Sequence, residues 1–431
     1  MSKAFKEWDT STLGEIGLPR TPNIDPSNYP KEIFELYSVP SFSLNEPEIV
    51  PGSEIGSTKQ LVEPGDVLLC KIVPHLVRVW CVPRRSTHRQ IASGEWIVVR
   101  PDPAKTDKQY LRYALIEPGF RSHFMETVSG VGGSLMRARP KAVAQISVPL
   151  PAKVEQVHIV TKLDSLFKRS NSAREELAHV PRLVERYRGA VLAAAFSGQF
   201  TEGWRLKYGV SVDRNWRQTT LGAISTDVRY GTAAKCHYEP KKTPVLRIPN
   251  IVNGRIDLSD VKYASFSKQE VEKLALRAGD LLVIRSNGSL SLVGRVALVP
   301  KAVAGHLYAG YLIRIRLDPK HVYPEFVQHA FDEPTIRQHI ESLAKSTSGV
   351  NNINSEQLKS IPFKIPPLEE QKEIVEKIQS AFSSIDHLRD EAIRADKLLD
   401  RLDQATLAKA FRGELMTEGE SLKSGSSYVA R

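Results

Sequence analysis

Residues 193–204 read AAAFSGQFTEGW and residues 409–420 read KAFRGELMTEGE, so an Ala-Phe-x-Gly signature occurs twice in the chain. Working back from each copy, Gln156 corresponds to Gln371, at an offset of 215 residues that stays constant over more than forty residues without a gap. An internal repeat of this length sets the plan of a whole fold. The sequence therefore predicts a duplicated structural element.

The segments that precede the two copies also correspond, with offsets that vary between 208 and 219 residues. Residues 64–69 read PGDVLL and residues 278–283 read AGDLLV, while Ser-Gly-Val occurs at 129–131 and again at 348–350. Varying offsets indicate loops of different length on a common frame. The predicted plan is a variable domain followed by a constant segment, twice over.

The second constant segment has the pattern of a long coiled-coil helix. Pro366 and Pro367 precede it, acidic residues occupy its first turn and Gly413 follows it, which are usual signals of a helix start and stop. Apolar residues recur along it at heptad spacing, at Ile374, Ile378, Ala381, Ile385, Leu388, Ala392, Ala395, Leu399 and Leu402. So long and narrow a seam is typical of a coiled coil. We expect one helix from about residue 369 to 411.

The first constant segment carries the same pattern with one interruption. Its apolar positions are Ala173, Leu177, Val180, Val184, Tyr187 and Val191. Pro181 falls among them and should kink the helix or divide it into two consecutive helices. The two segments either pack on each other or form independent amphipathic helices. We favour pairing, and the economical connection then makes the pair antiparallel, with one variable domain at each end and an approximate internal two-fold axis.

Each variable domain has the pattern of an α+β domain with short strands. Strands are predicted at 67–73, 77–82, 96–100, 281–285, 294–299 and 312–317. Helices are expected near 107–117 and 323–345, and Asn287-Gly288 predicts a hairpin turn. The predicted fold class is therefore α+β, with two α/β domains separated by two long helices that form an antiparallel coiled coil.

The composition narrows the possible partners and surroundings. Lys and Arg total 60 against 49 acidic residues, which gives a formal net charge of +11 and a pI near 9.4. This excess fits a polyanionic partner, and equally a basic surface without a function. The three cysteines lack metal-binding spacing, the N-terminus is polar, and no apolar run is long enough for a bilayer. We expect a cytoplasmic protein without a metal site or membrane contact.

Basic and polar side chains gather in the loops of both variable domains. The candidates in the first domain are Lys71, Arg84, Arg85, Arg137 and Arg139, and those in the second are Arg285, Asn287, Ser289, Asn351 and Asn352. Arginine reads guanine and asparagine reads adenine through paired hydrogen bonds, and serine lets the backbone approach phosphate. These residues either bind DNA or belong to ordinary solvated loops.

The sequence contains no recognisable catalytic motif. A phosphate-binding G-x-x-x-x-G-K-[ST] loop, the Asn/Asp-Pro-Pro-Tyr/Phe motif of an adenine methyltransferase and paired metal-binding histidines are all missing. Pro101-Asp102 is not followed by the acidic and lysine residues of a nuclease core. We expect a protein that is not an enzyme and has no cofactor of its own.

Two variable domains that alternate with two near-identical helical segments resemble the DNA-specificity (S) subunit of type I restriction–modification systems. The similarity covers essentially the whole chain, and its most specific parts are Glu155-Gln156 with Ala195-Phe196-Ser197-Gly198 and Glu370-Gln371 with Ala410-Phe411-Arg412-Gly413. The resemblance implies a first target-recognition domain at 1–150, a conserved helical spacer at 151–205, a second target-recognition domain at 206–365, a second spacer at 366–415 and a flexible tail at 416–431.

The same resemblance implies a function and a set of partners. Each target-recognition domain would read one half of a bipartite site in double-stranded DNA, and the helices would set the gap between the halves. Two methyltransferase subunits and two restriction or motor subunits would methylate adenine or cut the DNA. The cofactors S-adenosylmethionine, ATP and Mg²⁺ would be bound by those subunits.

The two variable domains differ at positions where base choice should vary. Gly132-Gly133 stands where the second domain has Asn351-Asn352, and Pro74-His75 lies near the place of Asn287-Gly288. Two other functions remain open. One is a coiled-coil DNA-binding scaffold without base specificity, and the other is an enzyme with a diverged catalytic centre.

Overall fold

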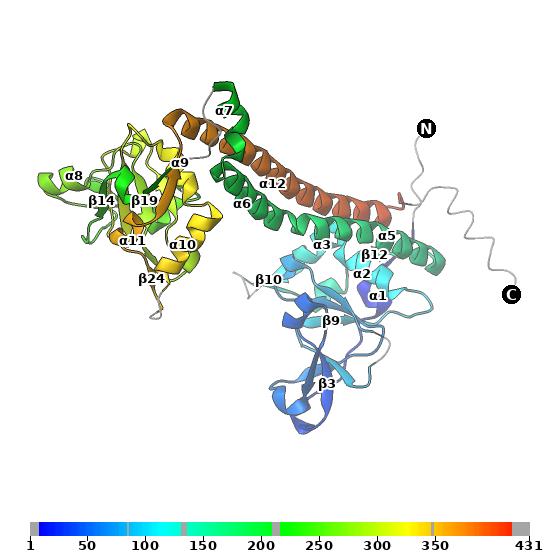
Figure 1. Ribbon diagram of the computed structural model, residues 1–431. Coiled ribbons are helices and arrows are strands. Elements are labelled where there is room, and N and C mark those ends of the chain that lie inside the picture. Colours follow the sequence, from blue (N-terminus) through cyan, green and yellow to red (C-terminus); the bar gives the residue numbers. More distant parts are fainter. Residues whose placement is uncertain (1–7, 84–85, 131–135, 209–215, 346–348, 416–431) are drawn as a thin grey trace. The chain divides into compact units, whose positions relative to one another are not determined.

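The structure, a computed structural model, describes residues 8–83, 86–130, 136–208, 216–345 and 349–415. It divides into two compact units, which we call the first unit (Met1–Ala178 with Ile393–Arg431) and the second unit (His179–Ala392). Helix α12 (Leu368–Phe411) contributes its earlier part to the second unit and its later part to the first. Short strands and helices are mixed in both units (Figure 1).

The first unit contains a five-stranded and a three-stranded sheet. The larger has the order β2 (Asn23–Ile24), β5 (Lys59–Leu61), β8 (Arg89–Ala92), β3 (Ile33–Tyr37) and β4 (Glu48–Pro51). The smaller places β6 (Val67–Cys70) between β7 (Val79–Cys81) and β9 (Trp96–Val99). Two strand pairs are β1 (Thr10–Thr12) with β12 (Ser147–Pro149) and β10 (Val128–Ser129) with β11 (Arg137–Ala138). Strands β6 and β9 are buried throughout, which is why they read as continuous apolar runs.

The core of the first unit joins its smaller sheet to helices. These are α1 (Leu13–Gly17), α2 (Lys108–Ile116), α3 (Pro118–Glu126), α4 (Pro140–Val143) and α5 (Lys153–Ala178). The Asp107 carboxylate caps α2 by accepting hydrogen bonds from the backbone amides of Gln109 and Tyr110. The rings of Tyr110 and Phe411 lie 5.1 Å apart between centroids. The last turn of α12 is therefore part of this core.

The second unit repeats the plan with a four-stranded antiparallel sheet. Its order is β14 (Ser225–Tyr230), β23 (Leu312–Leu317), β19 (Leu281–Ile284) and β21 (Val296–Leu298). A three-stranded sheet has the order β18 (Lys262–Ala264), β15 (Thr243–Leu246) and β22 (Leu307–Tyr308). The strand pairs are β13 (Arg217–Thr220) with β25 (Pro362–Ile365), β16 (Ile251–Val252) with β17 (Arg255–Ile256), and β20 (Ser286–Asn287) with β24 (Asn351–Asn352).

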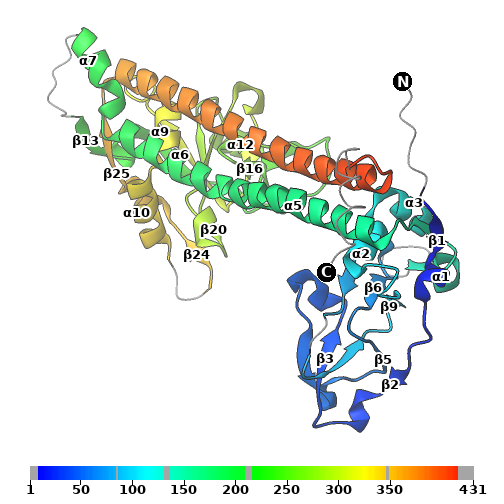
Figure 2. The ribbon, with the colours of Figure 1, turned by 90° about the vertical axis from the view of Figure 1, so that its right-hand side faces the viewer.

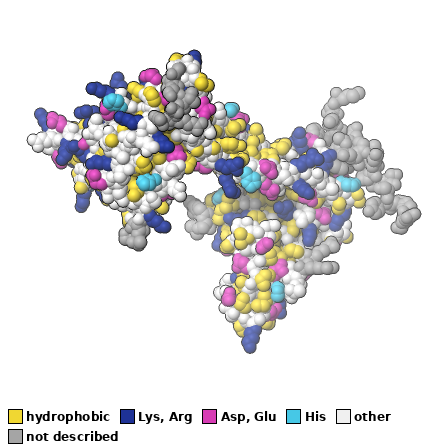
Figure 3. Space-filling model, viewed as in Figure 1, with side chains coloured by type: hydrophobic (Ala, Val, Ile, Leu, Met, Phe, Trp, Pro, Cys, Tyr) yellow, Lys and Arg dark blue, Asp and Glu magenta, His cyan; other side chains and the backbone are white. Residues whose placement is uncertain are grey.

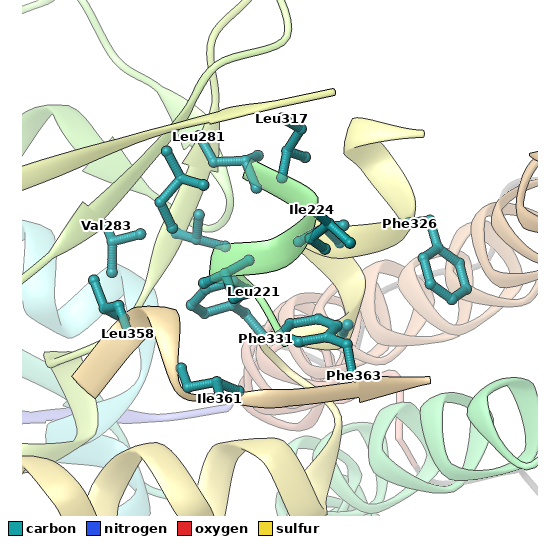
Figure 4. Close-up of a cluster of buried hydrophobic side chains, with 14 of the residues drawn as sticks. Leu221, Ile224, Leu281, Val283, Leu317, Phe326, Phe331, Leu358, Ile361 and Phe363 are labelled. Carbon is teal, nitrogen blue, oxygen red and sulfur yellow. The ribbon is translucent and has the colours of Figure 1, made fainter. Parts of the chain in front are cut away.

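The core of the second unit lies between its four-stranded sheet and the long helices. The helices of this unit are α6 (Val180–Phe196), α7 (Glu202–Tyr208), α8 (Lys268–Leu274), α9 (Pro324–Ala330), α10 (Pro334–Ala344), α11 (Ser355–Lys359) and the start of α12. Figure 4 shows part of the cluster, in which side chains of β19 and β25 approach Phe331. Leu192 of α6 and Ile374 of α12 belong to the same cluster.

In each unit a helix packs antiparallel on part of α12 (Figure 2). In the first unit Arg174 of α5 binds Asp400 and Asp403, at 2.9 and 2.8 Å, while Leu163 packs near Leu407, further along α12. Residue numbers thus fall along α5 while those of the α12 residues near it rise, so the two helices are antiparallel.

The second unit repeats this arrangement at the start of α12. Arg188 of α6 binds Asp386 at 2.5 Å, and the Lys377 Nζ donates to the Phe200 carbonyl oxygen at 2.7 Å. Residue numbers therefore rise from α6 toward Phe200 while those of their partners in α12 fall, so the two segments are antiparallel. The predicted antiparallel pairing is confirmed, and packing of each helix independently of the other is excluded.

The predicted interruption of the first helix is confirmed, and part of the predicted seam is wrong. Helix α5 ends at Ala178 and α6 begins at Val180, with Pro181 in its first turn, where a missing backbone N–H costs no hydrogen bond. Leu388 and Leu402 were expected in the seam, yet they are 65% and 55% exposed. A seven-residue pattern identifies an apolar side of a helix. Which residues of that side are buried depends on how much of it the neighbouring helix covers.

The predicted strands and helices are present within a few residues of the expected places, but the predicted hairpin turn is absent and one predicted helix is divided. Asn287-Gly288 does not close a tight hairpin, because Asn287 lies in β20 and pairs with Asn351 of β24. The predicted helix at 323–345 is divided into α9 and α10, and the Glu333 carboxylate caps the second of them. Among the helices that the structure describes, none is long and apolar enough to cross a membrane.

Candidate nucleic-acid interface

An ion pair between a buried aspartate and a partly exposed arginine lies at the start of the central strand in both units. Asp66, just before β6, accepts hydrogen bonds from Arg100 Nε and Nη2 at 2.7 and 2.8 Å. Asp280, just before β19, accepts the same pair of bonds from Arg316 at 2.8 and 2.7 Å. Hydrogen bonding to these carboxylates raises the pKa of both guanidinium groups. The Gly-Asp repeat in the sequence thus positions the strand whose end carries the candidate residues.

A buried glutamine fastens each long helix to the unit in which it begins. Gln371 Oε1 accepts from the Tyr323 amide at 2.8 Å, and its Nε2 donates to the carbonyl oxygens of His321 and Pro366 at 3.0 and 2.9 Å. Gln156 makes the same three bonds in the first unit, with the Asp107 amide and two carbonyl oxygens. The repeated Glu-Gln motif is therefore a junction between helix and domain.

The second unit brings its five candidate residues together. Arg285 follows β19, and its Nε donates to Asn352 Oδ1 at 3.2 Å. Asn287 and Asn351 face each other in the β20–β24 pair, and Asn351 Nδ2 donates to the Gly288 carbonyl oxygen at 3.0 Å. The Ser289 amide donates to Asn287 Oδ1 at 2.9 Å.

The first unit brings together only some of its candidates. Lys71 follows β6 and Arg137 lies in β11, and both contact Glu95, at 4.0 and 3.1 Å. Arg139 makes a different contact, since its Nε donates to the Thr127 carbonyl oxygen at 3.1 Å. Arg84 and Arg85 lie outside the described residues.

Two residues of these clusters were not among the sequence candidates. The Arg285 guanidinium lies 4.6 Å from the centroid of the Tyr230 ring, a cation–π contact that orients it. Glu95 is the acidic member of the first cluster. Neither belongs to a motif. Glu95 directly precedes a predicted strand, whereas no strand was predicted at Tyr230, which ends β14. Their proximity to the candidates depends on sheet pairing.

The clusters have the chemistry of a recognition surface. They present guanidinium, ammonium, amide and carboxylate groups that are at least partly exposed, so they can form hydrogen bonds with base edges and phosphates. On the face that Figure 3 shows, Lys and Arg occur over both units and are interspersed with Asp and Glu. Within the described part of the chain, no group of three or more His, Cys, Asp or Glu residues is placed to hold a metal ion.

Comparisons with known proteins agree on one family. A family model described as "Type I restriction modification DNA specificity domain" matches residues 215–394. The EcoKI specificity subunit of Escherichia coli K12 is 33% identical over 330 residues, covering 73% of this chain and 70% of that protein. The StySPI specificity subunit of Salmonella potsdam is 30% identical over 327 residues, with 73% and 70% covered.

Two solved structures share the fold. A chain from a study titled "Structural basis underlying complex assembly andconformational transition of the type I R-M system" superposes with a TM-score of 0.74 at 22% identity, covering 96% of this chain and all of that one. The HsdS subunit from Thermoanaerobacter tengcongensis superposes with a TM-score of 0.60 at 21% identity, covering 95% and 97%. At these identities the likeness concerns the fold alone.

Proposed function

This chain belongs to the family of type I restriction enzyme specificity subunits, and on that premise we propose that each of its variable domains reads one half of a bipartite site in double-stranded DNA. The observation that carries the proposal is the polar cluster found at the same place in both units. Arg285 and Asn352 in the second unit offer the donors and acceptors that guanine and adenine edges match.

The same proposal covers the partners and the reaction. Two methyltransferase subunits and two restriction or motor subunits bind this chain, and it directs them to methylate adenine or to restrict the DNA. They bind S-adenosylmethionine, ATP and Mg²⁺, while this chain has no catalytic role. The complex acts in the cytoplasm, and no membrane takes part.

Sequencing of modified adenines tests the base reading. Cells that express this chain with its methyltransferase subunit should carry methylation at one split motif with a fixed gap, and cells without this chain should lack it. Methylation spread over unrelated sequences would instead favour the alternative function, a DNA-binding scaffold without base specificity.

Salt dependence tests DNA as the ligand. The net charge of +11 supports binding to a polyanion. If six to ten phosphates are contacted, affinity of the reconstituted complex should fall by about three to five decades between 50 and 200 mM salt. A nearly flat dependence would contradict DNA binding through phosphate contacts.

A further inference from the structure

One pair of backbone hydrogen bonds aligns the two recognition clusters residue by residue. In the first unit the Lys71 amide donates to the Glu95 carbonyl oxygen at 3.0 Å, and in the second the Arg285 amide donates to the Tyr311 carbonyl oxygen at 3.0 Å. Lys71 directly follows β6 and Arg285 directly follows β19, while Glu95 and Tyr311 directly precede β9 and β23. Lys71 therefore occupies the position of Arg285, and Glu95 that of Tyr311.

A second pair of backbone bonds adds a third position. The Ala138 amide donates to the Lys71 carbonyl oxygen, and the Ile353 amide donates to the Arg285 carbonyl oxygen, both at 2.8 Å. The residues just before these two amides, Arg137 and Asn352, are therefore equivalent, so Asn352 corresponds to Arg137 and not, as the sequence comparison predicted, to Gly133. We name the resulting sets the first trio (Lys71, Glu95, Arg137) and the second trio (Arg285, Tyr311, Asn352).

The trios differ in side chains although their frame is the same. The supporting ion pair is Asp with Arg in both units, and the helix junction is Gln in both. All three trio positions carry a different residue in the two units. A duplicated frame that keeps its supporting residues and changes three adjacent partly exposed ones has the arrangement expected of two domains that read different bases.

The chemistry of the two trios is also different at equal net charge. Each trio carries a formal net charge of +1, so attraction to phosphate does not distinguish them. The first offers a carboxylate acceptor, Glu95, whose side chain is 28% exposed. The second has in its place the phenol of Tyr311, which is 64% exposed.

A carboxylate in a surface that binds a polyanion is repelled by phosphate. Hydrogen bonds that it accepts from the bound molecule can offset the free-energy cost of this repulsion. Cytosine offers its exocyclic amine to a Glu or Asp acceptor in the major groove. Arg137 Nη2 lies 3.1 Å from Glu95 Oε1 and Lys71 Nζ lies 4.0 Å from Oε2, so the carboxylate has a cation near each oxygen before DNA binds. Glu95 thus has the surroundings of a group that selects for a base.

We propose that the two trios are the base-discriminating side chains of their units, with Glu95 as an acceptor for an exocyclic amine and Tyr311 as its counterpart in the second unit. The inference rests on the proposed function, since it assigns specificity within the same sites. It adds Glu95 and Tyr311 as specificity-determining residues. It also predicts that the base sequence recognised at each half-site is determined by one trio.

The test uses the full chain expressed with its methyltransferase subunit, with modified adenines sequenced genome-wide. The isosteric change Glu95→Gln replaces an acceptor-only group by one that also donates. It should relax one base position by roughly 5- to 150-fold in a single half-site, and leave the other half-site and the gap unchanged. Lys268→Gln, at an exposed position of α8, is the matched control and should leave the motif intact.

A graft tests the second trio. Arg285→Lys, Tyr311→Glu and Asn352→Arg together place the first trio on the second frame, and should change only the other half-site. Motifs that match the wild type in both Glu95→Gln and the graft would overturn the inference. Wild-type cells without any defined motif would instead contradict the proposed function, so the two failures are distinguishable. A graft that does not fold leaves Glu95→Gln as the deciding variant.

Discussion

At Arg285 one side chain combines a cation–π contact with Tyr230 and a hydrogen bond to Asn352. Both contacts restrict the guanidinium before any ligand arrives, which lowers the entropy cost of a paired hydrogen bond with a base. A restricted guanidinium at the end of a strand is therefore suited to reading a base edge.

We predict that Arg285→Ala costs roughly 1–3 kcal/mol of binding to the cognate site and relaxes one position in one half-site. Binding of the reconstituted complex to cognate and single-substituted duplexes at fixed salt measures this. Arg255→Ala, an exposed arginine elsewhere in the second unit, is the control. An equal loss on every duplex would identify Arg285 as a phosphate contact.

His329 of α9 makes the second unit sensitive to acid. Its ring lies 5.8 Å from that of Phe382 on α12, and burial lowers the pKa of His329 to about 4, against a weaker opposing effect of Asp332. The unfolded chain, with a histidine pKa near 6.5, binds a proton between about pH 6.5 and 4 that the folded chain does not. This contribution to stability is complete above pH 6.5 and is lost as the pH falls.

His329→Gln should therefore flatten the loss of stability on acidification. The difference in slope should approach about 1.4 kcal/mol per pH unit between pH 6.5 and 4. Midpoints of urea unfolding for both proteins at pH 7.5, 6 and 5 measure it, and other titrating groups cancel in the comparison. Parallel curves would show that His329 is accessible to protons in the folded chain.

At the scale of elements, local signals predicted the helices better than the recognition site. Proline before α12 and Gly413 after it mark its ends closely, because both act within a few residues. The β20–β24 pair joins residues 64 and 66 positions apart, and no local pattern encodes that pairing. Arg285, Asn287 and Asn352 were found by residue type alone, whereas Glu95 and Tyr230 enter their clusters only through sheet pairing.

The hydrogen bonds of Gln371 should stabilise the attachment of α12 to the second unit. Gln371→Leu leaves the Tyr323 amide and two carbonyl oxygens without their partner, at about 1–3 kcal/mol for each group that stays buried. We expect a lower unfolding midpoint and, because α12 is then less firmly held, methylation at motifs with more than one gap length.

The control for this change is Gln379→Leu, an exposed glutamine on the same helix. It should alter neither the midpoint nor the gap. Gln371→Glu keeps the acceptor for the Tyr323 amide but turns a buried carboxylate oxygen toward two carbonyl oxygens, so a midpoint no higher than that of Gln371→Leu is expected. A midpoint for Gln371→Leu equal to that of wild type would contradict the assigned junction.

At the scale of the whole molecule, the ends of the two constant segments pack in equivalent ways in different units. Leu192, Ala195 and Phe196 end the first constant segment and pack in the second unit, where the Phe196 ring lies 4.9 Å from that of Phe326. Their equivalents, Leu407, Ala410 and Phe411, pack in the first unit. Each domain is thus completed by a helix end with the same sequence pattern, and the two ends should be interchangeable.

A fragment of residues 206–431 lacks α6 and the first part of α7 but retains the second copy of that helix end. In a homodimer, Leu407 and Ala410 of one copy can join the core cluster that contains Ile374 and Ile378 of the other, as Leu192 and Ala195 do in the intact chain. Burial of such apolar surface at ~25 cal/mol per Å² supports association, and the dimer has an exact two-fold axis where the chain has an approximate one. The fragment also loses Arg205, the partner of buried Glu370, so Glu370→Gln removes an unpaired charge.

We therefore predict that this fragment, with and without Glu370→Gln, directs the methyltransferase subunit to a palindromic split site. Both halves of that site should equal the half-site that the second domain reads in the full chain, because each copy in the dimer contributes the same second domain. Sequencing of modified adenines gives the motif, and sedimentation gives the oligomeric state. Methylation at the original asymmetric site, or a fragment that stays monomeric beside its partner, would show that the two helix ends are not interchangeable. The fragment with Glu370→Gln should form the more stable dimer, since a buried carboxylate without its arginine costs free energy at both copies of the interface.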